Sequence, residues 1–358
     1  MNYRTYKFYA RSTNTSDTTI VHDINMQDPI SSIILGFEFY HTGYVYQLAP
    51  VSCVKKIELI DGSDVLWSLD GYEAEALDWY NNGGKLRSNW NFQSTGGTVS
   101  RYVGIHFGRY LWDPEYAFDP TRFINPQLRV TLDINAASTT GSTIYLTMWA
   151  NMFDEGPTSL KGFFSCKELK QWTMADNVHE YTDLPLDYPY ESIFMRAYAD
   201  ETAPNSCLEN FKLSENQDKR IPYNNGGQEI LRNCLAEYGE VAENIIVAPH
   251  TTARACWVTP TERVFGLMQP WAAAAYDSGG TCYGGDGGHL AFIVKSASEN
   301  NQIRVVGATP HSTYKIPCGI KMQPETYYNV QALGSLRADI EGAGTAQGFI
   351  FLQQLRPY

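Results

Sequence analysis

The chain has 358 residues, long enough for two cores of ordinary domain size, and its formal net charge is −12. This charge argues against broad nucleic-acid binding, because a phosphate-binding surface needs clustered lysines and arginines. Charged residues make up only 18% of the chain, and 24 Tyr and 29 Gly favour an all-β protein over a helical one.

Residues 1–15 mix basic and aromatic side chains. Three positive charges, Arg4, Lys7 and Arg11, alternate with tyrosines and a phenylalanine. One interpretation is an extra strand or helix packed on the first domain. The other is an N-terminal arm that reaches an anionic surface, such as lipid headgroups or nucleic acid.

Short runs of alternating apolar residues follow, separated by Gly, Asn, Asp and Pro, a pattern typical of a β-sandwich or barrel. Asp70 and Glu73 have the spacing of a capping box, which predicts the start of a helix over Asp70–Asn81. The strands expected in the first unit are Ile20–Ile24, Ile30–Tyr40, Tyr44–Ile60, Tyr102–Phe107, Leu128–Ile134 and Thr143–Trp149.

The stretch from Val51 to Asn81 has a counterpart from Asn205 to Leu235, at a constant offset of 154 residues. The identical residues are Ser52, Cys53, Leu59, Asp64, Glu75 and Leu77, matched by Ser206, Cys207, Leu213, Asp218, Glu229 and Leu231. Further matches keep the same order in both halves: Asp23-Ile24, Pro29 and Ser32-Ile33 with Asp183-Leu184, Pro189 and Ser192-Ile193, and Leu128-Arg129 with Leu336-Arg337. A duplication explains these matches better than coincidence does, and it predicts two units with the same strand order.

Residues 154–159 have the composition of a linker, and we expect it to separate a first unit, 16–160, from a second unit, 161–358. Asn225 and Gln228 have capping-box spacing, and Gly239 is well placed to end the helix that follows them. The strands expected in the second unit are Ile193–Ala199, Leu208–Leu213, Ile245–Val247, Ala255–Val258, Leu290–Val294, Ile303–Val306 and Phe349–Leu352.

The second unit is longer than the first between its helix and the Leu-Arg strand. We therefore expect an inserted loop region around 240–330. The glycine-rich run Ser278–Gly288 within it predicts a flexible surface loop, at the outer tip of the second unit, that offers Tyr276, Tyr283 and His289 to solvent.

A search for catalytic motifs is nearly empty: no G-x-S-x-G, H-E-x-x-H, EF-hand loop or P-loop occurs. Asp113, Glu115 and Asp119, beside Tyr110 and Trp112, form the best candidate for a glycosidase-like pair of acids. The alternative is a turn-rich connection, since two of these acids precede prolines. We expect no catalytic, cofactor-binding or metal-binding residue.

Two pairs of possible metal ligands, Asp286 with His289 and His179 with Glu180, are too small for a coordination shell. The cysteines are odd in number and contain no C-x-x-C, so we expect them to be reduced core residues of a protein that folds inside a cell. The chain shows no signal peptide and no apolar run of 18 residues, so we do not expect secretion by the usual route.

With its duplicated blocks and the stretch from Ile105 to Leu128, the chain resembles the double jelly-roll major capsid proteins of the tectivirus and adenovirus lineage, of the prokaryotic virus type. The resemblance implies an all-β fold of two tandem eight-stranded antiparallel jelly rolls with short inserted helices. It also implies a capsid protein rather than an enzyme, whose homotrimer forms a pseudo-hexameric capsomer that tiles an icosahedral shell.

The implied partners are other copies of the chain, neighbouring capsomers, and minor capsid or penton proteins. Internal membrane lipid or the genome would be contacted through Arg4, Lys7 and Arg11. The implied location is the virion, after assembly in the host cytoplasm. Two other classes stay open: a carbohydrate-binding or carbohydrate-active β-sandwich protein, and a viral spike or receptor-binding protein.

Overall fold

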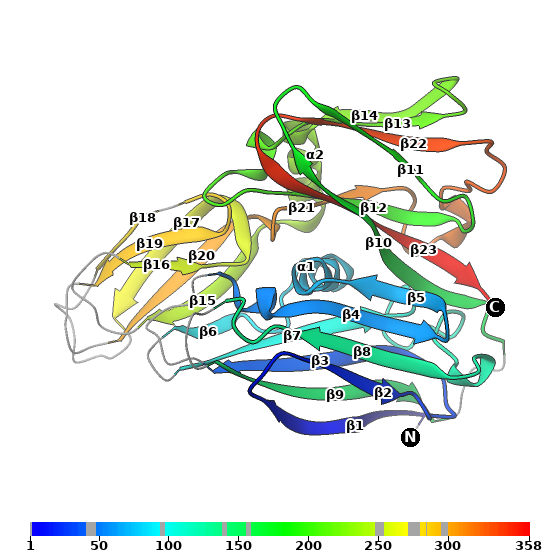
Figure 1. Cartoon of the computed structure of the whole chain (residues 1–358), viewed down its shortest axis with the longest axis horizontal. Helices are drawn as coiled ribbons and strands as arrows, with labels where there is room; N and C mark the ends of the chain where they lie inside the picture. The colour runs from blue at the N-terminus through cyan, green and yellow to red at the C-terminus, as the bar shows by residue number, and fades with distance from the viewer. Residues whose placement is uncertain are drawn as a thin grey trace.

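The computed structural model describes residues 2–40, 48–93, 97–137, 142–154, 159–247, 254–270, 280–283, 285–294 and 300–358. Figure 1 shows two β-sandwiches, one above the other, and a smaller β-sandwich that projects to the left. Among the helices of the described residues, none is long and apolar enough to span a lipid bilayer.

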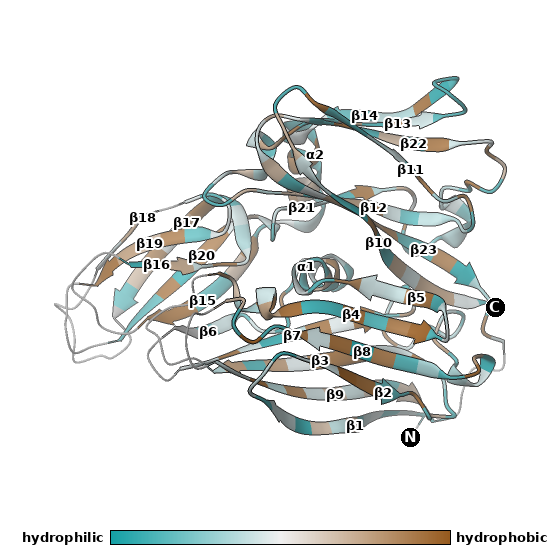
Figure 2. Ribbon diagram, viewed as in Figure 1, coloured by the Kyte–Doolittle hydropathy of each residue, from teal (hydrophilic) through white to brown (hydrophobic). Residues whose placement is uncertain are grey.

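The first unit is a sandwich of two sheets. One sheet has the order β1 (Tyr3–Asn14), β9 (Thr143–Phe153), β3 (Ile30–Tyr40), β7 (Thr98–His106). The other has the order β2 (Thr18–Asp23), β8 (Pro126–Leu132), β4 (Val54–Asp61), β5 (Asp64–Leu69). Every second side chain of β8 is buried, as expected where one face of a sheet packs on a core, and Figure 2 shows the interleaving of hydrophobic and hydrophilic residues along the strands.

The second unit repeats this order. One sheet runs β10 (Gly162–Met174), β23 (Ala346–Pro357), β12 (Tyr190–Tyr198), β21 (Thr313–Pro317). The other runs β11 (His179–Asp183), β22 (Leu336–Gly342), β13 (Leu208–Glu215), β14 (Arg220–Gly226). In both units the first strand pairs with the last and the second with the last but one, which is the jelly-roll arrangement. The fold prediction is therefore confirmed.

The matched blocks occupy equivalent positions in the two units. Cys53 ends a short 3₁₀ turn, η1 (Pro50–Cys53), directly before β4, and Cys207 follows η3 (Pro204–Ser206) directly before β13. The Leu-Arg match is displaced by two residues, because Leu59 pairs with Leu128 whereas its counterpart Leu213 pairs with Ala338. A shift of two residues keeps each side chain on the same face of the sheet.

Each unit carries one helix after its fifth strand. The predicted capping box of α1 (Gly71–Asn81) is confirmed, with Asp70 and Glu73 as its two members. The one predicted at Asn225 and Gln228 is wrong: Asn225 belongs to β14, where it pairs with Phe211, and the N-cap of α2 (Gly227–Tyr238) is Gly226, without a side-chain hydrogen bond. Gly239 does end α2, at φ 78°.

The region expected to be loops, around 240–330, contains a small β-sandwich, here called the insert. One of its sheets has the order β17 (Pro260–Pro270), β20 (Asn301–Pro310), β15 (Val241–Val247), β6 (Trp90–Gln93). The other has the order β16 (Arg254–Trp257), β19 (His289–Val294), β18 (Gly280–Tyr283). The insert is ordered because it has a core of its own, which includes Ile245, Leu290 and Ile303.

The N-terminal segment and the cysteines are both part of the folded units. The segment expected as an N-terminal arm forms β1, which pairs with β9 from Tyr3 opposite Phe153 to Asn14 opposite Ile144, so it is an edge strand. None of the seven cysteines, all of which lie in described residues, is in a disulfide. Five of them are buried, and burial raises the pKa of Cys53 to about 11.

Candidate functional site: the junction between the two jelly rolls

The two jelly rolls share a continuous apolar junction. Ser68 of β5 pairs in parallel with Lys167 of β10, so strands of both units form one 8-stranded sheet. Figure 1 shows α1 between the units, and the phenol of Tyr80 on α1 donates a hydrogen bond to the backbone oxygen of Thr313 at 2.7 Å. Phe194 of the second unit packs in the core of the first. Since α1 contacts both units, nearly all of its side chains are buried.

A buried cluster of charges also joins the units and the insert. Arg101 of β7 is 2% exposed, and its Nη2 donates to Glu243 Oε2 of β15 at 2.9 Å. Its Nη1 lies 3.5 Å from Glu75 Oε1 of α1, and His311 Nε2 lies 2.7 Å from Glu75 Oε2. Glu243 Oε1 also accepts a hydrogen bond from the backbone N–H of Thr259 at 2.7 Å.

The surroundings of Glu75 and Arg101 favour the charged forms of both side chains. Burial works to raise the pKa of Glu75, but the charge of Arg101 and the hydrogen bond with His311 hold this pKa below its ordinary value. Burial also opposes the charge on Arg101, yet Glu75 and Glu243 keep its pKa above the usual value. A general acid needs a raised carboxyl pKa, so this arrangement suits a structural tie rather than acid catalysis.

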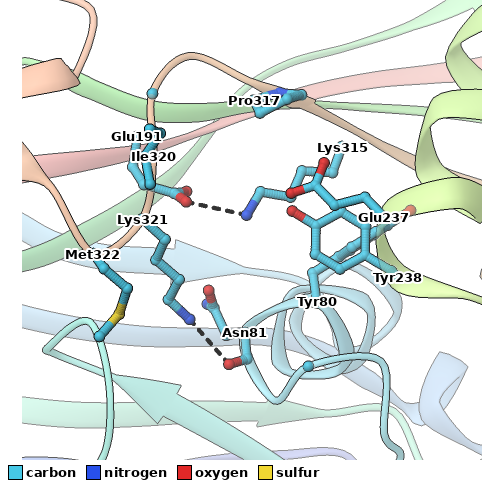
Figure 3. Close-up of a pocket in the computed structure, with 12 residues that line it drawn as sticks. Tyr80, Asn81, Glu191, Glu237, Tyr238, Lys315, Pro317, Ile320, Lys321 and Met322 are labelled. Carbon is cyan, nitrogen blue, oxygen red and sulfur yellow. Dashed lines mark hydrogen bonds and ion pairs between the residues drawn. The ribbon is translucent and has the colours of Figure 1, made fainter.

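A cavity of ≈ 680 Å³ lies between α1, α2, β12 and the end of β21 (Figure 3). Lys315 Nζ donates to Glu191 Oε1 at 3.1 Å, and both side chains are buried. Lys321 Nζ donates to the backbone oxygen of Asn81 at 2.9 Å. Tyr238 contributes an aromatic wall, with its ring centroid 5.3 Å from Lys315 Nζ. The cavity therefore combines two cations and one buried carboxylate with an apolar wall.

The three acids predicted as a candidate pair form a structural network instead. Asp113 is fully buried and binds Arg109 through two hydrogen bonds of 2.7 and 2.8 Å. Arg109 also donates to Glu115 at 2.7 Å, and Glu115 binds Lys161 as well. Asp119 caps a 3₁₀ turn, η2 (Pro120–Arg122), which agrees with the turn-rich alternative.

The electrostatics of this network do not suit a general acid. Burial works to raise the pKa of Asp113, but Arg109 and the backbone N–H of Glu115 lower it below its ordinary value. The pKa of Glu115 is also below its ordinary value, mainly because of the hydrogen bond from Lys161. Trp112 is not free to cover a sugar, because it stacks on Tyr3 with ring centroids 4.5 Å apart.

The remaining candidates lie apart from the junction. Asp286 accepts the backbone N–H of Arg263 at 3.1 Å, and His289 lies 3.5 Å from a carboxylate of Glu201. In the part of the chain that the structure describes, no group of three or more His, Cys, Asp or Glu is placed to hold a metal ion. Within the glycine-rich run, Gly280–Tyr283 form β18 and pair with β19. The rest of the loop prediction falls partly on 271–279 and 284, outside the described residues.

The other predicted pair, His179 with Glu180, also serves the sheet. His179 Nδ1 lies 2.7 Å from Asp339 Oδ1 on the neighbouring strand, and this hydrogen bond raises the pKa of His179. Glu180 instead binds Lys170. The two side chains therefore interact with different partners.

Two of the three basic residues at the N-terminus are engaged within the chain. Arg4 pairs with Asp28 at 2.6 Å and with Asp154 at 2.8 Å. Arg11 pairs with Glu38 at 2.7 Å and lies 3.5 Å over the ring of Tyr145. The third, Lys7, is exposed.

Sequence reasoning missed the junction residues. Arg101, Glu243 and His311 are far apart in the chain and belong to no motif. The sequence marks Glu75 only as an identity of the repeat, and its counterpart Glu229 has a different setting, exposed in the first turn of α2. Only the tertiary fold brings these charges together.

Solved structures share the whole fold of this chain. The crystal structure of the STIV MCP aligns with a TM-score of 0.62 at 10% identity, covering 99% of this chain and 97% of that chain. The atomic structure of Sulfolobus Turreted Icosahedral Virus gives 0.62 and 10%, covering 99% and 91%. The major capsid protein P2 of bacteriophage PM2 gives 0.54 and 11%, covering 99% and 98%. The chain thus has the double jelly-roll fold.

The comparisons by sequence found no match for the chain. No protein-family model matches it, and no curated protein matches its sequence.

Proposed function

We propose that this chain is the major capsid protein of an icosahedral virus. The observation that carries the proposal is the identical strand order of two jelly rolls, tied together by a buried junction. A chain that holds two similar jelly rolls together can serve as the subunit of a six-lobed capsomer, and a shell can be built from such capsomers. The likeness to the major capsid protein of bacteriophage PM2, over 99% of the chain, supports the same role.

In this proposal three copies form the capsomer. A chain with two similar lobes gives six lobes around a threefold axis, and six-lobed capsomers pack side by side as hexagons do. The negative net charge keeps free copies apart at long range until specific contacts form. The domain division proposed with it gives the first jelly roll the core range 16–160 together with the edge strand β1, and gives the second jelly roll 161–358, with the insert on the second.

The proposed partners are other copies of the chain, neighbouring capsomers and minor capsid or penton proteins, within a virion assembled in the host cytoplasm. Contact with membrane lipid or genome rests mainly on Lys7, because Arg4 and Arg11 are already ion-paired. The proposed role is structural, with no catalytic residue, cofactor or metal.

The competing class is a carbohydrate-binding or carbohydrate-active protein. It would use the acids around Asp113 and Glu115, whose pKa values are lowered and whose charges are paired with Arg109. A spike or receptor-binding protein is a second competitor, and it would not tile.

The experiment is light scattering of the purified chain coupled to size exclusion, followed by electron microscopy of concentrated samples. The proposal expects a mass of three chains and six-lobed particles that form sheets or shells. An oligosaccharide panel should leave the mass and the thermal midpoint unchanged. A stable monomer at high concentration, or a specific oligosaccharide complex without assembly, contradicts the proposal.

A further inference from the structure

The cavity at the junction contains buried polar atoms without partners. Glu191 is 1% exposed, and although its Oε1 binds Lys315, its Oε2 has no hydrogen-bond partner among the described residues. The side-chain nitrogen and oxygen of Asn81 are buried and also lack partners there. Buried polar groups are nearly always hydrogen-bonded, so these atoms point to a bound species. Figure 3 shows the side chains of Glu191, Lys315, Lys321 and Asn81 gathered around one space.

The charges of the cavity favour an anion. Lys315 and Lys321 supply two positive charges, and the buried carboxylate of Glu191 supplies one negative charge. Lys321 Nζ binds a backbone oxygen, and none of the described carboxylates forms an ion pair with it. Glu237 lines the cavity from the exposed end of α2. Away from the exposed Glu237, two lysines therefore face the single carboxylate of Glu191, whose Oε2 is an acceptor that needs a donor.

We propose that this cavity binds inorganic phosphate in a protonated form. The charged oxygens of the ion accept hydrogen bonds from Lys321 Nζ and the amide nitrogen of Asn81, close to Lys315. Its P–O–H group donates to Glu191 Oε2. Phosphate keeps at least one such hydrogen at neutral pH, so one small ion satisfies both the cations and the carboxylate. The inference does not depend on the proposed capsid function.

Sulfate is the discriminating competitor. It is tetrahedral and similar in size, but it carries no hydrogen at neutral pH. Bound here, it would place a negative oxygen against Glu191 and leave Oε2 without a donor. A site built around a hydrogen bond rejects an analogue that cannot make it, so we expect sulfate to bind at least about tenfold more weakly than phosphate.

Titration calorimetry of the full chain with potassium phosphate and then with potassium sulfate tests the proposal. Ionic strength is matched and the salts are kept dilute, because both ions favour compact states at high concentration. We expect saturable heat and a rise in the thermal midpoint with phosphate alone. Equal binding of both ions means an adventitious ion only, and that result, like the absence of binding, overturns the proposal.

Two variants locate the ion. Glu191→Gln replaces one acceptor by an N–H donor, so it should bind sulfate as well as phosphate. If loss of the pair with Lys315 prevents this variant from folding, Lys321→Met, at a half-buried position, carries the test. It should weaken phosphate at least about tenfold, while the control Lys219→Met, on the β13–β14 turn, leaves affinity unchanged. Unchanged phosphate affinity in Lys321→Met rejects the site.

The pH dependence offers an independent readout. Burial, followed by the charge of Lys315, lowers the pKa of Lys321 to about 8, against the opposing effects of Glu191 and Asp78. Lys321 is thus charged at neutral pH and loses its proton above about pH 8. Phosphate affinity should fall over that range, and a constant affinity through it contradicts the role given to Lys321.

Discussion

Arg101 Nη2 lies 2.9 Å from Glu243 Oε2, and both side chains are almost fully buried, so a strand of the first jelly roll is tied to the insert of the second. Glu75, 3.5 Å from Arg101 Nη1, extends this contact to α1, and His311 extends it to the chain before β21. The desolvated charges stabilise one another only as a set, because removal of one leaves the others buried and unpaired. The contact thereby fixes the relative placement of the two jelly rolls.

Replacement of Arg101 should destabilise the fold. Arg101→Met leaves Glu75 and Glu243 buried without their cation, and we expect it to lower the free energy of unfolding by about 3–5 kcal/mol. Urea unfolding followed by tryptophan fluorescence measures the loss. The control is Arg122→Met, which removes an exposed pair with Asp119 and should cost less than about 1 kcal/mol. Equal losses in the two variants contradict a special role for Arg101.

The insert contains a carboxyl group that should make stability depend on pH. Glu262 is 2% exposed, its Oε2 accepts from Tyr314 Oη at 3.3 Å, and burial raises its pKa to about 7. Since this pKa is above the ordinary value, the stability that Glu262 contributes is complete below about pH 4.3 and is lost as pH rises through about 7.

Glu262→Gln should therefore be more stable than the natural chain at pH 8, by up to about 3 kcal/mol, and similar to it near pH 4. Urea unfolding at the two pH values gives the comparison. Glu209→Gln, at an exposed position of β13, is the control and should show no such difference. An equal effect of Glu262→Gln at both pH values contradicts the titration.

The duplication allowed the fold to be predicted from the sequence. Cys53 and Cys207 lie before the fourth strand of their units because the same strand, turn and helix recur in both. Not every identity is equivalent, since Leu128 and Leu336 differ by two residues in register. That displacement was invisible in the sequence because an even shift leaves the apolar pattern of a strand unchanged.

The insert and the junction could not be predicted in the same way. Glycines in 239–335 favoured loops, whereas a core around Ile245 and Leu290 orders the strands there. The edge strand β6 comes from the first unit and pairs in parallel with β15, a contact between distant segments that no local periodicity encodes. The same holds for the charges at Arg101 and Glu243.

The start of α1 depends on its confirmed capping box. Asp70 Oδ1 accepts the N–H of Glu73 at 2.7 Å, and Glu73 Oε2 accepts the N–H of Asp70 at 3.2 Å. Asp70→Ala should lower the free energy of unfolding by about 1 kcal/mol, while Asp70→Asn, which can still cap, should cost less. Asn225→Ala is the comparison in the second unit, where Gly226 is the N-cap, and its loss in urea unfolding should be smaller. A larger loss in the free energy of unfolding for Asn225→Ala than for Asp70→Ala would contradict this prediction.

The insert packs closely on the second jelly roll at Gly287. This residue has φ +63°, and an added Cβ would lie 2.6 Å from the backbone oxygen of Ala199 and 2.7 Å from the backbone nitrogen of Glu201. Gly62, at φ +61° with nothing within 4 Å of such a Cβ, is a matched control. Alanine at either position adopts the left-handed conformation at a cost of about 1–2 kcal/mol, but only Gly287→Ala must also displace backbone.

We therefore expect Gly287→Ala to lose about 1–3 kcal/mol more than Gly62→Ala in urea unfolding. Trp257, which packs against His289 with ring centroids 5.5 Å apart, places a fluorescent reporter beside the contact. If the insert separates from the second jelly roll before the rest unfolds, fluorescence should change at lower urea than circular dichroism does in Gly287→Ala alone. Equal losses in both variants would mean that the chain around Ala199 yields to the new methyl group, so that the contact does not fix the insert.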